Sequence, residues 1–232
     1  MDAKEFTGLA QAWRSIESMM FAEEPDFIGD VRERCEMDGL RQGSSAQASF
    51  LRLQTMALGV RSAILIGSAC VVEALYMLTG LTGQSPEPGQ LTVVDSNPRA
   101  CETLRAAFDR GCAAGVLDPR LKLRVVSADV ARFLGRLNVG DYDLMVVSGQ
   151  MSNYRPAIDE AGHLLRGNGM LLVADTLALA DESDDGGVLN PASRSVKATG
   201  MRALIPELIE DDRFVTSLVP VGTGLLMAVR AR

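Results

Sequence analysis

The sequence predicts an α/β protein built on a mainly parallel, doubly wound sheet. Short apolar runs rich in Val, Ile and Leu alternate along the chain with segments whose apolar residues recur at helical spacing. Several of these runs end in a small or acidic residue, as at Gly67, Asp95 and Asp175. The last part of the chain contains two strand-like runs joined by a tight turn at residues 220–224, which predicts an antiparallel hairpin.

Three helices are expected before the first strand. Residues 6–20 place apolar side chains on one helical stripe, which must cover the core or a partner subunit. A second helix is expected over residues 25–37, because its leading proline suits a first helical turn. The third covers residues 46–56 and follows the polar stretch 41–45, which suits a helix cap.

From residue 59 onwards, strands and helices alternate. Strands are expected at residues 63–67, 91–95, 121–126, 142–147 and 170–175, with hairpin strands at 214–218 and 225–229. Helices are expected at residues 71–78, 100–108, 130–137, 156–165 and 192–210. Loops are expected at residues 79–90 and 176–190, and a turn at 167–169. We expect a single domain over residues 1–232, with N-terminal helices in 1–58 and the sheet-containing core in 59–232.

Composition excludes several classes of function. The chain has 23 Lys and Arg against 30 Asp and Glu, a net charge of -7, which disfavours a nucleic-acid partner because phosphate neutralisation needs a basic face. No apolar run is long enough to span a membrane, and the N-terminus lacks a signal peptide, so a cytoplasmic protein without a membrane partner is expected. The 4 cysteines lack CxxC spacing and there is a single histidine, which supports neither a zinc site nor disulfides.

The carboxyl ends of the parallel strands meet at one edge of the sheet, where ligands are expected. The tight turn after Gly67 presents free backbone N–H groups and the positive end of a helix dipole. An acid after the second strand suits the hydroxyls of a ribose, so a nucleoside-containing cofactor fits this edge. A nicotinamide-dependent oxidoreductase is disfavoured, because Ala69 and Val72 stand where the GxGxxG fingerprint has glycines. The residues expected at this edge are Gly67, Ser68, Ala69, Asp95, Ala128, Asp129, Ser148 and Asp175.

A series of short motifs carries a resemblance to a known family. They are ILIGS at 64–68, LTVVD at 91–95, YDL at 142–144, NY at 153–154, LLRGNG at 164–169, LVAD at 172–175, DDRF at 211–214 and PVGTGL at 220–225. Their order resembles the class I S-adenosylmethionine-dependent O-methyltransferases, specifically the bacterial group similar to catechol and caffeoyl-CoA O-methyltransferases. The resemblance implies a Rossmann-like core with seven strands, S-adenosylmethionine as cofactor, a small-molecule acceptor and a homodimer.

The resemblance also implies a set of cofactor contacts. Gly67 and Ser68 would lie under the methionine part of the cofactor, Asp95 would bind the ribose, and Asp129 with Val130 would border the adenine. The first motif departs from the family pattern of acid-x-Gly-x-Gly-x-Gly, because only its first glycine is kept. The full set of implied cofactor-binding residues is Leu65, Gly67, Ser68, Ala69, Glu73, Asp95, Ser96, Asp129, Val130, Ser148 and Gln150.

The family's divalent metal is held by two aspartates and an asparagine, matched here by Ser148, Asp175 and Thr176. Only one carboxylate is kept, and the lysine that assists deprotonation in the family is Met151 here. Because hard cations need several oxygen ligands, we expect no metal, with Asp175 and Ser148 as the catalytic candidates. Asp175 is either a general base or simply an acid at a strand end or a helix-capping group, and His163 is assigned to packing.

Glu73 stands where the resembling family commonly has a serine facing the carboxylate of the cofactor's methionine. Two interpretations stay open. Glu73 either repels that carboxylate and weakens cofactor binding, or it only complements the helix dipole with its side chain in solvent. The predicted function is methyl transfer from S-adenosylmethionine to a hydroxyl of a small molecule, without a metal ion. The alternative is a catalytically inactive relative that acts as a cofactor-binding or dimeric interaction module.

Overall fold

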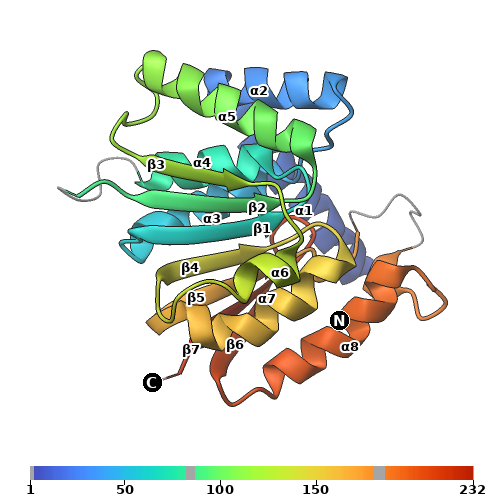
Figure 1. Ribbon diagram of the computed structural model, residues 1–232. Helices are drawn as coiled ribbons and strands as arrows, with labels where there is room; N and C mark the ends of the chain where they lie inside the picture. The colour runs from blue at the N-terminus through green and yellow to red at the C-terminus, as the bar shows by residue number, and fades with distance from the viewer. Residues whose placement is uncertain (1–2, 82–86, 180–185, 232) are drawn as a thin grey trace.

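The computed structural model describes residues 3–81, 87–179 and 186–231, with side chains from residue 11 onwards. In these ranges seven strands form one sheet in the order β3-β2-β1-β4-β5-β7-β6 (Figure 1). The strands are β1 (Ser62–Gly67), β2 (Gln90–Asp95), β3 (Lys122–Val126), β4 (Tyr142–Val147), β5 (Leu165–Ala174), β6 (Phe214–Val219) and β7 (Leu225–Arg230). The helices are α1 (Ala3–Ala22), α2 (Asp26–Met37), α3 (Ser45–Ala57), α4 (Val71–Leu81), α5 (Pro98–Ala113), α6 (Val130–Leu134), α7 (Met151–Leu164), α8 (Val196–Ile209) and the 3-10 helix η1 (Gly187–Leu189).

The strand pairing confirms the predicted topology. Strand β1 lies between β2 and β4, and the pairs β2–β3 and β4–β5 are also parallel. Strand β7 pairs antiparallel with β5, and β6 pairs antiparallel with β7, so the closing hairpin extends the sheet beside the fifth strand. The sheet is therefore mainly parallel, with its antiparallel part at one end.

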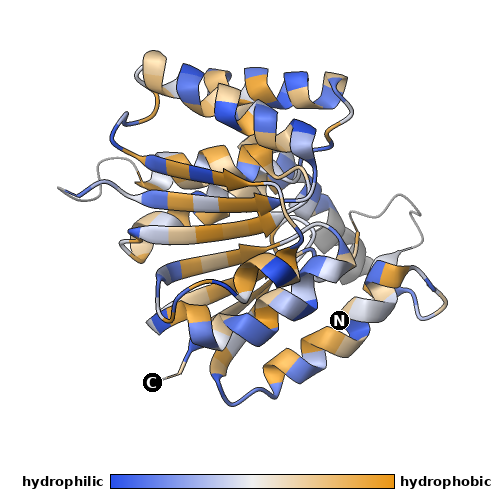
Figure 2. Ribbon diagram, viewed as in Figure 1, coloured by the Kyte–Doolittle hydropathy of each residue, from blue (hydrophilic) through white to orange (hydrophobic). Residues whose placement is uncertain are grey.

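Helices cover both faces of the sheet, as the apolar runs predict. Helices α2 to α5 lie on one face, and α6, α7 and α8 on the other (Figure 1). In β1, Ala63 and Leu65 belong to the first apolar core, while Ile64 and Ile66 belong to the second. Figure 2 shows the same division, with apolar strands inside and hydrophilic residues on the outer surfaces of the helices. Because both faces of β1 are buried, its sequence is continuously apolar instead of alternating.

Several element boundaries differ from the sequence-based expectation. Helix α4 continues to Leu81 instead of ending near residue 78. Helix α7 begins at Met151 and contains Pro156, which we had expected to start the helix. Helix α8 begins at Val196, because the Ser195 side chain accepts a hydrogen bond from a backbone N–H in the first turn. None of the helices in the described ranges combines the length and apolar character that a membrane span needs.

The expected turn at residues 167–169 is a bulge inside β5. Tyr142 pairs with Leu165 and Leu144 with Met170, so residues 166–169 stand opposite a single residue of β4. The bulge brings the guanidinium of Arg166 to 2.5 Å from the carboxylate of Asp143. The bulge in β5 therefore allows an ion pair to form between two neighbouring strands.

Asp143 also fixes the start of β1. Its carboxylate accepts the backbone N–H groups of Arg61 and Ser62, both at 2.9 Å. Partial burial opposes ionisation of Asp143, but these N–H groups and the Arg166 guanidinium outweigh it and lower the pKa of the carboxyl group. The ionised form is therefore the form that stabilises the fold.

Asp143→Asn is expected to lower the free energy of unfolding by about 1 to 2 kcal/mol at neutral pH, because it removes a charge-assisted contact. The loss should shrink as the pH falls below the ordinary carboxyl value of 3.8, where the native Asp143 also becomes protonated. Urea unfolding at a series of pH values measures both effects. Asp141→Asn changes the same charge two residues away and serves as the control. A loss that stays constant down to acid pH would show that the Asp143 charge is not involved.

Candidate active site

The turn between β1 and α4 has an unusual backbone conformation. Ala69 has a φ of 62°, in the left-handed region that L-residues rarely adopt. The carboxylate of Asp95, at the end of β2, accepts the backbone N–H groups of Ala69 at 2.6 Å and of Asn97 at 2.8 Å. Asp95 is buried, and this burial raises the pKa of its carboxyl group against the opposing effect of the N–H donors. Asp95 therefore holds the turn from inside the protein.

Gln42 holds the same turn from the other side. Its amide nitrogen donates to the carbonyl oxygen of Ala69 at 2.9 Å, and its amide oxygen accepts the N–H of Val72 at 3.0 Å. One side chain from the loop before α3 thus satisfies a backbone donor at the start of α4. No signal in the sequence marks Gln42, because a glutamine in a polar loop carries no distinctive spacing.

Glu73 lies in the first turn of α4 and is buried, with 6% of its surface exposed. Its side chain accepts a hydrogen bond from the backbone of Gly43, and a Cβ at Gly43 would come within 2.2 Å of its Oε1. Its Oε2 is buried without a hydrogen-bond partner in the described part of the chain. Burial raises the pKa of Glu73. The interpretation that this side chain lies in solvent is therefore wrong.

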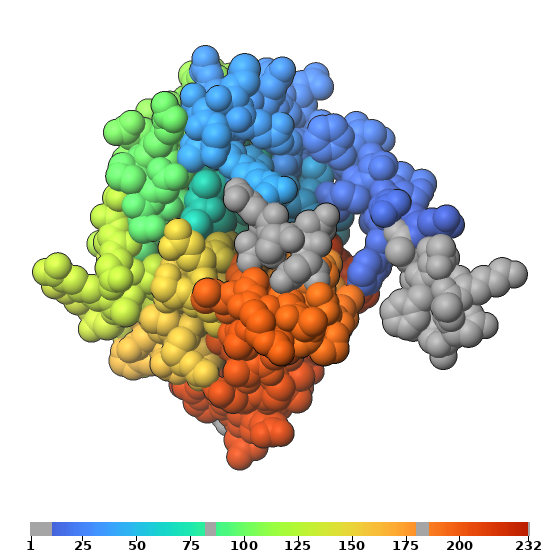
Figure 3. All heavy atoms as spheres, turned by 90° about the vertical axis from the view of Figure 1, so that its right-hand side faces the viewer, coloured from blue at the N-terminus to red at the C-terminus, as the bar shows by residue number. Residues whose placement is uncertain are grey.

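A cavity of about 720 Å³ opens at the carboxyl ends of β1, β4 and β5. Its walls come from the loop before α3, the turn before α4, the start of α7 and the start of α8. Figure 3 looks toward this edge of the molecule, where the chain from α2 to α3 faces α8. Of the residues expected at the site, the cavity brings together Ser68, Ala69, Glu73, Ser148, Gln150 and Asp175.

Other expected residues do not line this cavity. Leu65 is fully buried in the core, Gly67 ends β1, and Asp95 lies behind the turn that it supports. Gly67 leaves no room for a side chain, since a Cβ there would be 2.2 Å from the sulfur of Cys70. Ser96 is exposed and also lies outside the cavity lining. These residues shape the site without facing it.

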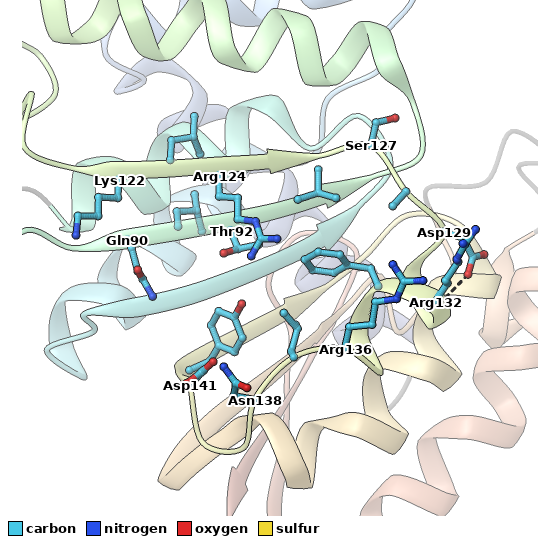
Figure 4. A pocket seen from close by; sticks show the side chains of 17 residues that line it. Gln90, Thr92, Lys122, Arg124, Ser127, Asp129, Arg132, Arg136, Asn138 and Asp141 are labelled. Carbon is cyan, nitrogen blue, oxygen red and sulfur yellow. Dashed lines mark hydrogen bonds between the residues drawn. The ribbon is translucent and has the colours of Figure 1, made fainter.

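Asp129 lies at a second groove on the surface, and Val130 lies next to it in the chain. Asp129 caps α6 by accepting a backbone N–H at 2.9 Å, and Val130 is buried in the core below. Asp129 lines a groove of about 900 Å³ beside β2 and β3 (Figure 4). The groove also presents four basic side chains, so its charge contrasts with the acidity of the whole chain. These are Lys122, Arg124, Arg132 and Arg136.

Asp175 is joined to a lysine that the sequence analysis missed. The Nζ atom of Lys197 lies 2.8 Å from Oδ2 of Asp175 and 2.8 Å from the hydroxyl of Tyr154. It also donates to the carbonyl oxygen of Gly149. Tyr154 in turn donates to the backbone of Ala174 at 3.2 Å. No spacing in the sequence connects Asp175 with Lys197, because Asp175 directly follows β5 and Lys197 lies on α8, far apart along the chain.

Ser148 is tied into the framework of the same cavity. Its hydroxyl lies 2.9 Å from the sulfur of Cys70, and its backbone N–H donates to Ile66 at 2.8 Å. Burial raises the pKa of the Cys70 thiol, so the thiol is the stable form beside Ser148. The side chain of Asn153 also donates to the backbone carbonyl of Ser148. Ser148 thus has a fixed place between β1 and α7.

The donor set at Asp175 does not fit a divalent metal ion. Asp175 is the one carboxylate among the three matched positions, and it is already paired with an ammonium group. Ser148 and Thr176 offer only neutral oxygens, which bind hard cations weakly. Within the described ranges, no three His, Cys, Asp or Glu side chains are grouped as metal ligands. We therefore derive no catalytic step through a metal.

A mainly parallel sheet with a cavity at its carboxyl edge, facing the start of a helix, defines a Rossmann-like ligand-binding protein. The profile of the O-methyltransferase family matches residues 21–231. A Mycobacterium leprae protein provisionally named an O-methyltransferase is 30% identical over 207 residues, covering 89% of this chain and 86% of the relative. The chain belongs to the O-methyltransferase family.

Solved structures show the same fold. An O-methyltransferase from Bacillus cereus in complex with SAH has a TM-score of 0.72 at 16% identity, covering 95% of this chain and 99% of that one. The O-methyltransferase TomG from Streptomyces achromogenes, involved in tomaymycin synthesis and in complex with SAM, has a TM-score of 0.71 at 16% identity. That match covers 96% of this chain and 98% of TomG.

Glu73→Gln is expected to stabilise the protein at neutral pH by about 1 to 3 kcal/mol, because the native chain buries a carboxylate that has one oxygen, Oε2, without a hydrogen-bond partner in the described residues. The pKa of Glu73 is raised by burial, so the folded protein becomes less stable as the pH rises above the ordinary value of 4.5. The gain should therefore vanish near pH 4, where the native carboxyl group is already protonated. Thermal unfolding at several pH values measures this, with the exposed Glu36→Gln as control. A gain that does not depend on pH would mean that ionisation of Glu73 is irrelevant.

Proposed function

We propose that the protein transfers a methyl group from S-adenosylmethionine to a hydroxyl group of a small molecule. The observation that carries the proposal is the cavity at the turn before α4, together with membership of the O-methyltransferase family. Two of the structurally similar O-methyltransferases were solved with SAH or SAM. The acceptor would enter the part of the cavity between the start of α7 and the start of α8.

The residues of the turn fit such a cofactor. Ser68 lines the cavity, and its hydroxyl is buried without a hydrogen-bond partner within the described residues, which favours a polar ligand group beside it. Gly149, with a φ of 83°, keeps the space beside it open, since a Cβ there would come within 2.7 Å of the Ser68 hydroxyl. A buried hydroxyl beside an open cavity is stabilised when a ligand pairs with it. Of the two carboxylates in the described cavity wall, Asp175 is paired with Lys197, whereas Glu73 opposes an anionic group.

When bound, S-adenosylmethionine supplies a methyl group on a positively charged sulfur. The chain's own contribution is mainly positioning, because a rigid turn and two strand ends form the walls of the cavity. Asp175 is the proposed acid-base residue of the acceptor side, with its carboxylate oriented by Lys197. Ser148 is the other proposed catalytic residue; it directly follows β4, as Asp175 directly follows the neighbouring strand β5, and both line the cavity.

Calorimetry and a transfer assay test this function. S-adenosylmethionine and S-adenosylhomocysteine are expected to bind, while NAD is not. Incubation with labelled S-adenosylmethionine and a panel of phenols and alcohols should give a methyl ether, detected by mass spectrometry. Binding without transfer to any acceptor would favour the alternative of a non-catalytic module. Absence of binding would remove the proposed function altogether.

Glu73→Ser in the same titration tests the wall residue. We expect tighter cofactor binding, because repulsion of about 4 kcal/mol between two carboxylates at ~4 Å would be removed. An unchanged affinity would show that the methionine carboxylate of the cofactor does not approach Glu73.

We further propose that the protein is a homodimer that pairs through α1. From residue 11 to its end, most side chains of this helix are exposed, including four large apolar ones, and this part of α1 lies at the surface of the molecule (Figure 3). The exposed fractions are 39% for Trp13, 51% for Ile16, 63% for Met19 and 60% for Phe21. Exposed apolar stripes of this kind mark interaction surfaces.

Light scattering should give the mass of a dimer at micromolar concentration. Ile16→Glu combined with Met19→Glu is expected to shift it to a monomer, because charges would replace the apolar stripe. Leu189→Glu, at an equally exposed apolar residue far from α1 in the sequence, should leave the mass unchanged. A monomeric native protein would contradict the proposal.

We also propose that the protein is cytoplasmic and that it forms a single domain. All four cysteines are free thiols, which supports a cytoplasmic, reducing environment. Residues of α2 and α3 share one apolar core with α4 and α5, which supports a single domain including the N-terminal helices.

A further inference from the structure

The ammonium group of Lys197 is held like a bound cation. Three oxygens surround it, and they come from three elements: the carboxylate of Asp175, the hydroxyl of Tyr154 and the backbone carbonyl of Gly149. An ammonium group has three N–H donors, so each donor has an acceptor. The side chains of Lys197 and Asp175 are only 12% and 8% exposed, respectively. This is a formed cation site whose cation belongs to the chain.

We infer that Lys197 is a built-in cation that takes the place of the divalent metal ion at the ends of β4 and β5, and that the protein binds no divalent ion there. The position follows from the chain itself. Asp175 directly follows β5, Gly149 lies in the turn after β4, and Lys197 reaches both from α8. Ser148 and Lys197 line the same cavity as Asp175.

Charge balance supports the same assignment. The three positions matched to metal ligands contribute one carboxylate, and one ammonium group neutralises it. A divalent ion added beside Lys197 would leave an excess of positive charge in a mostly buried place, which is strongly unfavourable. The Nζ atom also lies 4.7 Å from the centre of the Tyr154 ring, a further favourable contact for a cation. The neutral residues at 148 and 176 and the lysine at 197 are thus all consistent with a built-in cation in place of a divalent metal ion.

The part of the inference that concerns catalysis rests on the proposed function. In a working methyltransferase, the fixed positive charge of Lys197 would act on the acceptor side of the cavity without an added ion. The part that concerns cation binding does not depend on activity, and it is tested separately.

Manganese binding, followed by electron paramagnetic resonance, tests the cation site directly. Ser148→Asp with Thr176→Asn restores oxygen ligands but keeps Lys197, and this double variant is expected not to bind Mn²⁺ at millimolar concentration. Adding Lys197→Met should tighten binding at least about tenfold, because the competing ammonium group is gone. The control adds Lys122→Met to the double variant, and it should behave as the double variant does. Equal Mn²⁺ binding with and without Lys197, whether tight or absent, would overturn the inference, as would binding of Mn²⁺ by the native protein at Asp175.

A second measurement applies if the triple variant does not fold. Lys197→Ala should melt at a lower temperature than the native protein, and ethylammonium chloride should restore part of the loss. Tetramethylammonium chloride at the same concentration should not, because it has no N–H donors for the three oxygens. Equal effects of the two salts would overturn the inference.

The activity assay separates this inference from the proposed function. Methyl transfer by the native protein is expected to be unchanged by EDTA or by Mg²⁺. If no acceptor is methylated but the Mn²⁺ results hold, the proposed function fails and the built-in cation stands. If transfer occurs and requires Mg²⁺, the inference fails and the proposed function stands.

Discussion

The site depends on the buried carboxylate of Asp95, which joins the ends of two strands to the start of α4. Its bonds to the N–H groups of Ala69 and Asn97 hold the left-handed backbone of Ala69 in place. Such a conformation costs a non-glycine residue on the order of 1 kcal/mol, so it persists only where the surroundings impose it. Asp95 imposes it by accepting the backbone N–H of Ala69. Gln42 imposes it by donating to the carbonyl oxygen of Ala69 and accepting the N–H of Val72. Side chains thus do in this chain what glycines do in the glycine-rich turns of related folds.

The N-terminal helices build the opposite wall of the cavity. Arg32 forms a buried pair with Glu24 at 2.7 Å and donates to the carbonyl oxygen of Gly43 at 2.8 Å. Glu17 of α1 accepts hydrogen bonds from the hydroxyl of Ser44 and the backbone of Ser45, both at 2.7 Å. These contacts fix the loop that carries Gln42 and Gly43 against the turn. The position of Glu73 in the wall is therefore decided by residues far from it in the sequence.

The fold could be predicted from the sequence because local patterns determine it. Buried parallel strands require apolar residues on both faces, and this requirement leaves runs such as Ile64–Ile66 that are readable without a structure. Boundaries were less predictable where one side chain decides them. Pro156 lies inside α7, and the Ser195 cap moves the start of α8.

The site was only partly predictable. The rule that parallel strands end at one edge predicts that Ser68, Ser148 and Asp175 lie close together, and all three line one cavity. It could not show that Asp95 faces inwards, because the backbone N–H groups that compete for its carboxylate are invisible in a sequence. It also missed Lys197, whose role depends on how α8 packs against β5.

A cation carried on the chain differs from a dissolved ion in how its supply is controlled. The local concentration of a metal ion depends on the surrounding solution, and it falls when other molecules compete for the ion. The concentration of a tethered group near its partners is set by the chain that connects them. The contact between Lys197 and Asp175 therefore makes the charge at this strand end a property of the folded protein, present whenever α8 is docked and independent of the supply of a dissolved metal ion.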